Sequence, residues 1–197
     1  MKVTTPRIIV VAIVAGGLGL AASVGFNGNP FWRTQVGERA LHAATNATAP
    51  EPPTGVTPAD IGDPMPAIAL PDVDGAVVDL RTRYAGKRLL INVWASWCGP
   101  CIEEMPELDR FAESQGADGV QVIGLALDTP EGVRDFIAQV PVRYPIVLDT
   151  PGPADASVWL GNAKGVLPYT VLVDADGRIA RQKIGPFTHG EISGWVD

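Results

Sequence analysis

Residues 88–101 read RLLINVWASWCGPC, and this stretch decides the fold. The apolar run from Arg88 to Trp94 is typical of a strand that is buried on both faces. A helix is predicted from about Pro100 to Ser114, because proline in a first helical turn gives up an N–H that has no partner there. The only two cysteines, Cys98 and Cys101, therefore lie where a buried strand passes into a helix.

Strands and helices alternate on both sides of this motif. The expected elements are a hairpin around residues 72–80, strands over 120–127 and 145–148, a helix over 130–139 capped by Thr129, a hairpin formed by 169–173 and 178–184, and a closing helix over 189–196. Strand–helix–strand units give parallel pairing, and the last hairpin adds an antiparallel edge. We expect an α/β domain over residues 59–197, with a mixed central sheet, helices on both faces and an N-terminal β-hairpin extension.

Charge and cysteine content exclude several classes of protein. The chain has 197 residues, with 15 basic and 22 acidic side chains. Four of these bases and two of the acids precede residue 59, which leaves 11 bases, 20 acids and a charge of −9 for residues 59–197. A nucleic-acid-binding domain needs a positive surface, so that class is excluded. Two cysteines are also too few for a disulfide-stapled scaffold.

The N-terminal region is predicted to export the protein. Residues 8–26 are 19 consecutive uncharged residues, enough for a helix of about 28 Å, close to the thickness of a bilayer core. Lys2 and Arg7 precede them, which favours a cytoplasmic N-terminus and a single-pass anchor over residues 1–26, with the domain on the periplasmic side of the cytoplasmic membrane. A cleaved signal peptide is the alternative. Residues 27–58, rich in Ala, Thr and Pro towards the end, are expected to form a linker with at most a helical turn over 37–44.

The cysteine pair is predicted to be redox-active. A helix N-terminus stabilises a thiolate at Cys98, which can attack a disulfide, and Cys101, one turn deeper, can resolve the mixed disulfide. A structural bridge is disfavoured, because closing so small a loop removes little entropy from the unfolded chain. A zinc site would need two more ligands, and the only histidines are His42 in the linker and His189 near the end.

Together with its flanking segments, the motif resembles a known family. WCGPC after an apolar strand resembles the thioredoxin active site, and the wider set resembles the membrane-anchored TlpA/ResA-type thiol–disulfide oxidoreductases. The matching segments are IGDPMP (61–66), NVWASWCGPC (92–101), EMP (104–106), YPIVLD (144–149), GVLPYT (165–170) and VDADG (173–177). The resemblance implies a thioredoxin fold and exchange with protein thiols and disulfides, without a cofactor beyond the cysteine pair. It also implies a reductant in cytochrome c or copper-oxidase assembly, recharged by a membrane thiol donor.

The resemblance also assigns roles around the cysteines. It implies a cis bond between Leu167 and Pro168 packed against the cysteines, so that loop backbone can pair with an extended substrate. Glu104, one turn from Cys101 on the flank of the buried helix face, resembles the family's active-site acid and would take the proton from Cys101. Trp97, Gly99 and Pro100 are expected to shape the site, and Gly99-Pro100 resembles reducing thioredoxins.

Asn92 departs from thioredoxin itself. Thioredoxin has a buried aspartate at this position, whereas Asn92 cannot titrate, so the role of proton acceptor passes to Glu104 or to water. Trp94, like Trp97, is expected to shape and shield the site, with simple core packing as the alternative for either residue.

Two other functions remain as alternatives. A thiol peroxidase would need Thr or Ser three residues before the attacking cysteine, where Ala95 stands. A thioredoxin-like metallochaperone could carry copper(I) on the two thiolates. It would normally add a histidine, for which His189 is the only candidate in the folded part.

Overall fold

The computed structural model describes residues 34–197, so the apolar stretch over residues 8–26 lies outside the described part. The chain divides into two compact units, Met1–Ala40 and Leu41–Asp197. Helix α2 (Gln35–Asn46) begins in the first unit and ends in the second. Among residues 34–197, no helix has the length and apolar character needed to cross a bilayer.

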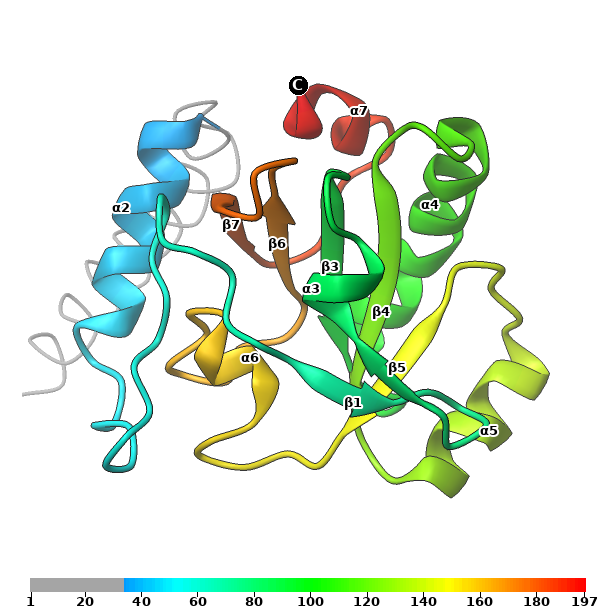
Figure 1. The fold of residues 1–197 in the computed structure, drawn as a ribbon, viewed down its shortest axis with the longest axis horizontal. Helices are drawn as coiled ribbons and strands as arrows, with labels where there is room; N and C mark the ends of the chain where they lie inside the picture. The colour runs from blue at the N-terminus through cyan, green and yellow to red at the C-terminus, as the bar shows by residue number, and fades with distance from the viewer. Residues whose placement is uncertain (1–33) are drawn as a thin grey trace, which may run out of the picture. The chain divides into compact units, whose positions relative to one another are not determined.

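A five-stranded mixed sheet forms the centre of the second unit (Figure 1). Its strands are β3 (Leu89–Trp94), β4 (Gln121–Leu127), β5 (Ile146–Asp149), β6 (Tyr169–Val173) and β7 (Ile179–Ile184), in the order β5-β4-β3-β6-β7. Strand β4 is parallel to both β3 and β5, whereas β6 is antiparallel to β3 and to β7. All six residues of the central strand β3 are buried, as its apolar run predicts.

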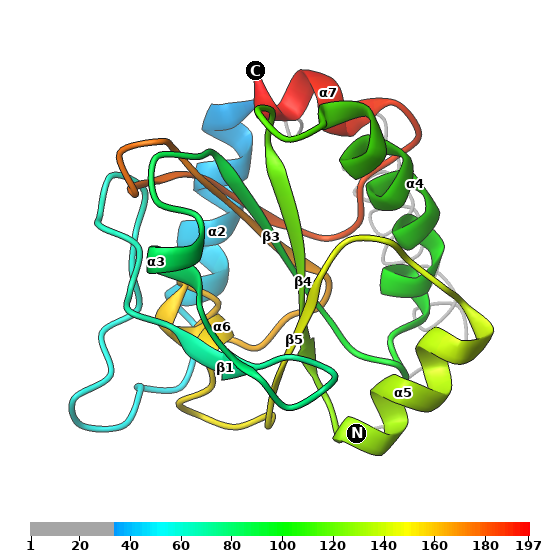
Figure 2. The ribbon, with the colours of Figure 1, turned by 45° about the vertical axis from the view of Figure 1, so that its right-hand side comes forward.

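Helices cover both faces of this sheet (Figure 2). On one face lie α4 (Gly99–Gln115), α5 (Pro130–Gln139) and α7 (Glu191–Val196); on the other lie α3 (Leu80–Arg83), α6 (Ala156–Trp159) and the antiparallel hairpin of β1 (Ala69–Pro71) and β2 (Val77–Asp79). Each face has its own apolar cluster, and the cluster under α4 contains both cysteines. The site therefore rests on the core beneath α4.

The main elements of the domain are confirmed to within about two residues. The expected N-cap of α5 is also present, since the Thr129 side chain accepts a hydrogen bond from the backbone N–H of Gly132. Two four-residue helices, α3 and α6, were not predicted; each is capped by an aspartate, Asp79 and Asp155 respectively.

Helix α2 differs from the expected linker. It continues to Asn46, beyond the helical turn expected over residues 37–44. Its last turns are held by distant parts of the chain, because His42 and Asn46 both make hydrogen bonds to the carbonyl oxygen of Gly161.

Candidate active site

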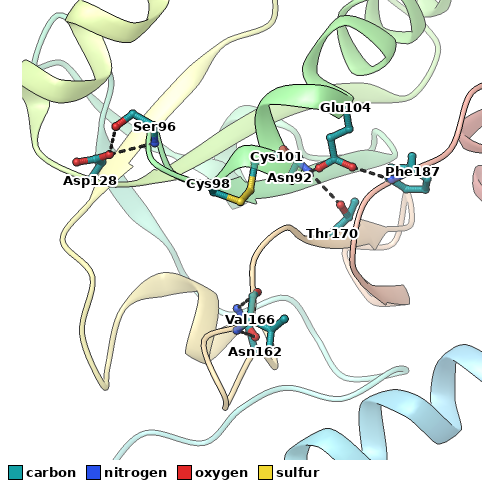
Figure 3. Close-up of a disulfide and its surroundings, with 10 residues drawn as sticks. All are labelled: Asn92, Ser96, Cys98, Cys101, Glu104, Asp128, Asn162, Val166, Thr170 and Phe187. Atoms are coloured by element: carbon teal, nitrogen blue, oxygen red, sulfur yellow. Dashed lines mark hydrogen bonds between the residues drawn. A yellow bond between two sulfur atoms is a disulfide. The ribbon is translucent and has the colours of Figure 1, made fainter. Parts of the chain in front are cut away.

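The two cysteines form a disulfide at the start of α4 (Figure 3). Cys98 is the N-cap residue of the helix, and its carbonyl oxygen accepts hydrogen bonds from the N–H groups of Cys101 and Ile102. The Cα atoms of the two cysteines are 5.3 Å apart. Cys98 retains 6% of its surface exposed, whereas Cys101 has none. Only Cys98 can be reached by a partner, which is the order of access expected from the sequence.

The helix start also sets the chemistry of the reduced pair. No side chain caps the first turn of α4, and Pro100 removes one of its unpaired donors. The positive end of the helix dipole favours negative charge on the N-cap sulfur. Once the pair is reduced, this environment favours the nucleophilic thiolate form of Cys98.

The turn between β3 and α4 is held by an aspartate that the sequence did not single out. Oδ2 of Asp128 accepts hydrogen bonds from the backbone N–H of Ser96 at 3.0 Å and from the Ser96 hydroxyl at 2.5 Å (Figure 3). Asp128 directly follows β4, which is parallel to β3. The carboxyl ends of parallel strands meet at one sheet edge, so an acid directly after β4 was the available signal.

The loop before β6 forms the second wall of the site. The peptide bond between Leu167 and Pro168 is cis, as the resemblance implied. Tyr169 pairs with Val93, so Pro168 lies beside the end of β3 that leads to the cysteines. Leu167 packs against the apolar cluster that contains Cys98 and Cys101. The loop and the disulfide are thus neighbours.

Asn162 fixes the backbone of this loop and was also missed from the sequence. Its Nδ2 donates to the carbonyl oxygen of Val166 at 3.0 Å, and its Oδ1 accepts from the N–H of Val166 at 2.9 Å (Figure 3). The Asn162 side chain is 2% exposed. Both polar groups of one loop residue are therefore paired by a buried amide four positions earlier.

Glu104 is buried one turn along α4 from Cys101, and 2% of its surface is exposed. Its Oε1 accepts from Asn92 Nδ2, and its Oε2 accepts from the N–H of Phe187, both at 2.8 Å. Desolvation raises the pKa of Glu104 to about 7, although these two hydrogen bonds and the positive charge of Lys183 act in the opposite direction. The carboxyl group can therefore exchange a proton near neutral pH.

Asn92 is a neutral side chain hydrogen-bonded to Glu104, at the position where thioredoxin has a buried aspartate. Besides bonding Glu104, its Nδ2 donates to Thr170 Oγ1 at 3.1 Å, while its Oδ1 is buried without a partner. If the amide turned over, Oδ1 would face the carboxyl group and could accept from protonated Glu104. A neutral amide at this position can therefore bond either protonation state of Glu104.

The remaining predicted residues fall into an exposed and a buried group. Trp97, Gly99 and Pro100 are exposed around Cys98, and 69% of the Trp97 surface is accessible, so it is available to a partner. Trp94 is fully buried and packs on Phe136, which makes it a core residue.

The copper alternative finds no support from histidine. His189 is 87% exposed in its side chain and lies 3.1 Å from Glu107. In residues 34–197, no group of three or more His, Cys, Asp and Glu side chains is arranged to hold a metal ion.

A helix-capping cysteine pair beside a cis-proline loop, on a mixed sheet covered on both faces, defines the class of thioredoxin-fold thiol–disulfide oxidoreductases. The chain belongs to the Redoxin family, whose model matches residues 60–195, and within it to the TlpA/ResA-type proteins. It is 33% identical to the thiol:disulfide interchange protein HelX of Rhodobacter capsulatus, over 74% of this chain and 80% of HelX. It is 29% identical to the thiol-disulfide oxidoreductase ResA of Bacillus cereus, over 69% of this chain and 76% of ResA.

The solved structures agree with this class. A putative thiol:disulfide interchange protein DsbE from Chlorobium tepidum superposes with a TM-score of 0.60 and 29% identity, covering 69% of this chain and 93% of that one. The predicted thioredoxin fold is therefore confirmed, and the enzyme is a thiol–disulfide oxidoreductase.

Proposed function

We propose that the enzyme reduces disulfides of client proteins outside the cytoplasm, with Cys98 as the attacking residue. The Cys98 thiolate attacks one sulfur of the client disulfide, forms a mixed disulfide and releases the first client thiolate. Cys101 then attacks Cys98, releases the second client thiolate and closes the Cys98–Cys101 bond. Two electrons pass from the enzyme dithiol to the client. The single observation that carries this assignment is the difference in access, because Cys98 reaches the surface and Cys101 does not.

Glu104 serves this cycle as the proton acceptor for Cys101. The resolving thiol must lose its proton before it attacks, and it lies in a buried place where few groups can take one. Glu104 is one helical turn away, and its pKa of about 7 lets it accept and return a proton near neutral pH. With Asn92 neutral, Glu104 is the acid best placed for this role.

The client class and location follow from the resemblance and the N-terminal sequence. The apolar residues 8–26 would tether the domain to the cytoplasmic membrane, with the cysteines on its periplasmic side. There the enzyme would keep cysteine pairs of apocytochrome c or of copper-site proteins reduced, and a membrane thiol carrier would return two electrons to the Cys98–Cys101 disulfide. The Gly99-Pro100 dipeptide supports the reducing direction. The likeness to ResA and HelX, whose names describe thiol–disulfide oxidoreduction and interchange, supports exchange with thiols and disulfides.

The test is a Cys101→Ala variant expressed in its native envelope. Without the resolving thiol, the mixed disulfide at Cys98 persists and its partners can be identified by mass spectrometry after non-reducing separation. We expect the trapped clients to be proteins whose CxxC pair later binds haem or copper. The matched control is the double variant Cys98→Ala, Cys101→Ala. An empty trap, or partners that persist in the double variant, would overturn the assignment.

A further inference from the structure

A buried histidine outside the cysteine site has no part in the chemistry above. His42 lies in the second half of α2 and is 8% exposed. Its Nε2 is 3.0 Å from the carbonyl oxygen of Gly161 and 3.1 Å from the hydroxyl group of Tyr169. Because a carbonyl oxygen only accepts, Nε2 carries the hydrogen of the neutral ring. One imidazole thus contacts two residues that lie on either side of a loop.

That loop is the one that carries the cis bond. Gly161 stands at its start, and Tyr169 directly follows Pro168. The Asn162 side chain pairs with Val166 between these ends (Figure 3). The loop over residues 161–169 is therefore bonded at both ends to His42 and in its middle to Asn162.

Only glycine fits at position 161. Its φ is +103°, and a Cβ atom there would lie 2.3 Å from Gln182 Nε2 and 2.5 Å from the carbonyl oxygen of Ala59. Its carbonyl oxygen also accepts from Asn46 Nδ2, at 3.1 Å. The backbone at the start of the loop is thus packed tightly and directs its carbonyl group towards the end of α2.

Tyr169 is fixed on two sides at the other end. Its hydroxyl group donates to the carbonyl oxygen of Leu160 at 3.1 Å, so it accepts from His42. The two rings are stacked, with centroids 5.9 Å apart and planes inclined by 25°. The imidazole therefore joins the residue after Pro168 to the residue that opens the loop.

We propose that His42 is a positioning residue for client binding, which holds loop 161–169 in the conformation that presents the Leu167–Pro168 backbone to an extended client. The inference rests on the proposed function and adds to it a part of the chain that lies before the thioredoxin-like domain predicted from the sequence. If a client binds only the held conformation, weakening the hold raises the apparent dissociation constant in inverse proportion to the fraction of molecules that keep this conformation. The exchange step at Cys98 stays the same once the client is bound.

The test compares full-length variants in insulin reduction driven by dithiothreitol. For His42→Leu, which removes the donor but keeps an apolar side chain, we expect the KM for insulin to rise about threefold to tenfold, as the loss of one or two ordinary hydrogen bonds allows. We expect kcat to stay within about twofold. His42→Gln keeps an N–H donor of similar reach and should restore most of the KM. Ala43→Gln, at the exposed neighbouring position, is the matched control.

An independent readout follows the loop itself. In 15N-labelled oxidised protein, His42→Leu should shift or broaden the backbone amide signal of Leu167 and leave the Trp97 indole signal in place. An unchanged KM would overturn the proposal, and so would kcat falling in step with the melting temperature. If His42→Leu fails to fold, Tyr169→Phe keeps the ring and removes the hydroxyl contact with His42 together with the hydrogen bond to Leu160. A rise in its KM with kcat within about twofold supports the proposal. Unfolding of both variants would refute it, because His42 would then support the whole domain. Inactive wild-type enzyme would instead refute the proposed function.

Discussion

At the scale of single residues, the burial of Glu104 makes a prediction about stability. Its pKa is about 7 in the folded protein against an ordinary value of 4.5, so the folded state keeps this proton over a range in which the unfolded state loses it. The contribution of Glu104 to the free energy of unfolding is therefore greatest below pH 4.5, falls as the pH rises towards 7, and no longer changes above pH 7. Two and a half pH units correspond to about 3 kcal/mol.

Glu104→Gln should remove this dependence. The glutamine is isosteric, and the unpartnered Oδ1 of Asn92 can accept from its amide if Asn92 turns over. Urea unfolding of the oxidised protein, in which neither cysteine titrates, measures the difference between variant and wild type from pH 4.5 to 8. Between pH 4.5 and 8, the free energy of unfolding of the variant should rise by about 3 kcal/mol relative to that of the wild type. A difference that does not vary with pH would show that Glu104 has an ordinary pKa.

The same substitution should slow the chemistry at the resolving step. Glutamine cannot accept the proton of Cys101, and general-base contributions of this kind are typically about 100-fold or more. Stopped-flow measurement of mixed-disulfide decay at pH 7 should show this loss. Alkylation of Cys98 by iodoacetamide in the fully reduced enzyme should proceed at nearly the wild-type rate. Equal decay rates for variant and wild type would show that water, and not Glu104, accepts the proton of Cys101.

At the scale of elements, the turn between β3 and α4 depends on an acid from the next strand. Asp128→Ala leaves the backbone N–H of Ser96 without its acceptor and should lower the free energy of unfolding by about 1.5–3 kcal/mol, the range for hydrogen bonds to a charged group. Ser96→Ala removes only the hydroxyl contact and should cost less. Thermal or urea unfolding of the two variants gives the order, and an equal loss would mean that the backbone contact contributes nothing.

The elements themselves were largely predictable from the sequence, because their signals are local. The apolar run of β3, the proline in the first turn of α4 and the Thr129 cap each lie within a few residues of what they specify. The place of Glu104 on the flank of the buried helix face indicated partial burial, and the structure buries it almost completely. Such features need no knowledge of distant parts of the chain.

The contacts that complete the site were not predictable in this way. Asp128 lies 32 positions from Ser96, and the N–H that bonds Glu104 belongs to a residue 83 positions further on. His42 lies in a segment of linker-like composition, and its partners are 119 and 127 positions away. Its burial depends on the folded loop, which no local pattern describes.

At the scale of the whole molecule, the proposed function gives the folded domain and the N-terminal stretch separate tasks. The acidic domain carries the cysteine site, whose described residues lie between Asn92 and Phe187. The proposed tether therefore affects where the enzyme works and leaves the exchange chemistry to the domain. Its contribution should be visible only when the client is itself delivered at a membrane.

Replacing residues 1–26 by a cleavable signal peptide tests this division of tasks. If residues 8–26 form an uncleaved anchor, the native chain sediments with membranes, resists extraction by high salt and carbonate, and keeps its first residues in mass spectra of the mature protein. The replaced form should be soluble after export. It should reduce insulin with unchanged kcat and KM, because it keeps every described residue of the site. In the envelope, it should trap fewer membrane-delivered clients through the Cys101→Ala substitution, since the local concentration supplied by the tether is lost. A native mature chain that has lost residues 8–26 and is recovered in the soluble fraction would instead assign these residues to a signal peptide. Equal trapping by both forms would show that client capture needs no tether.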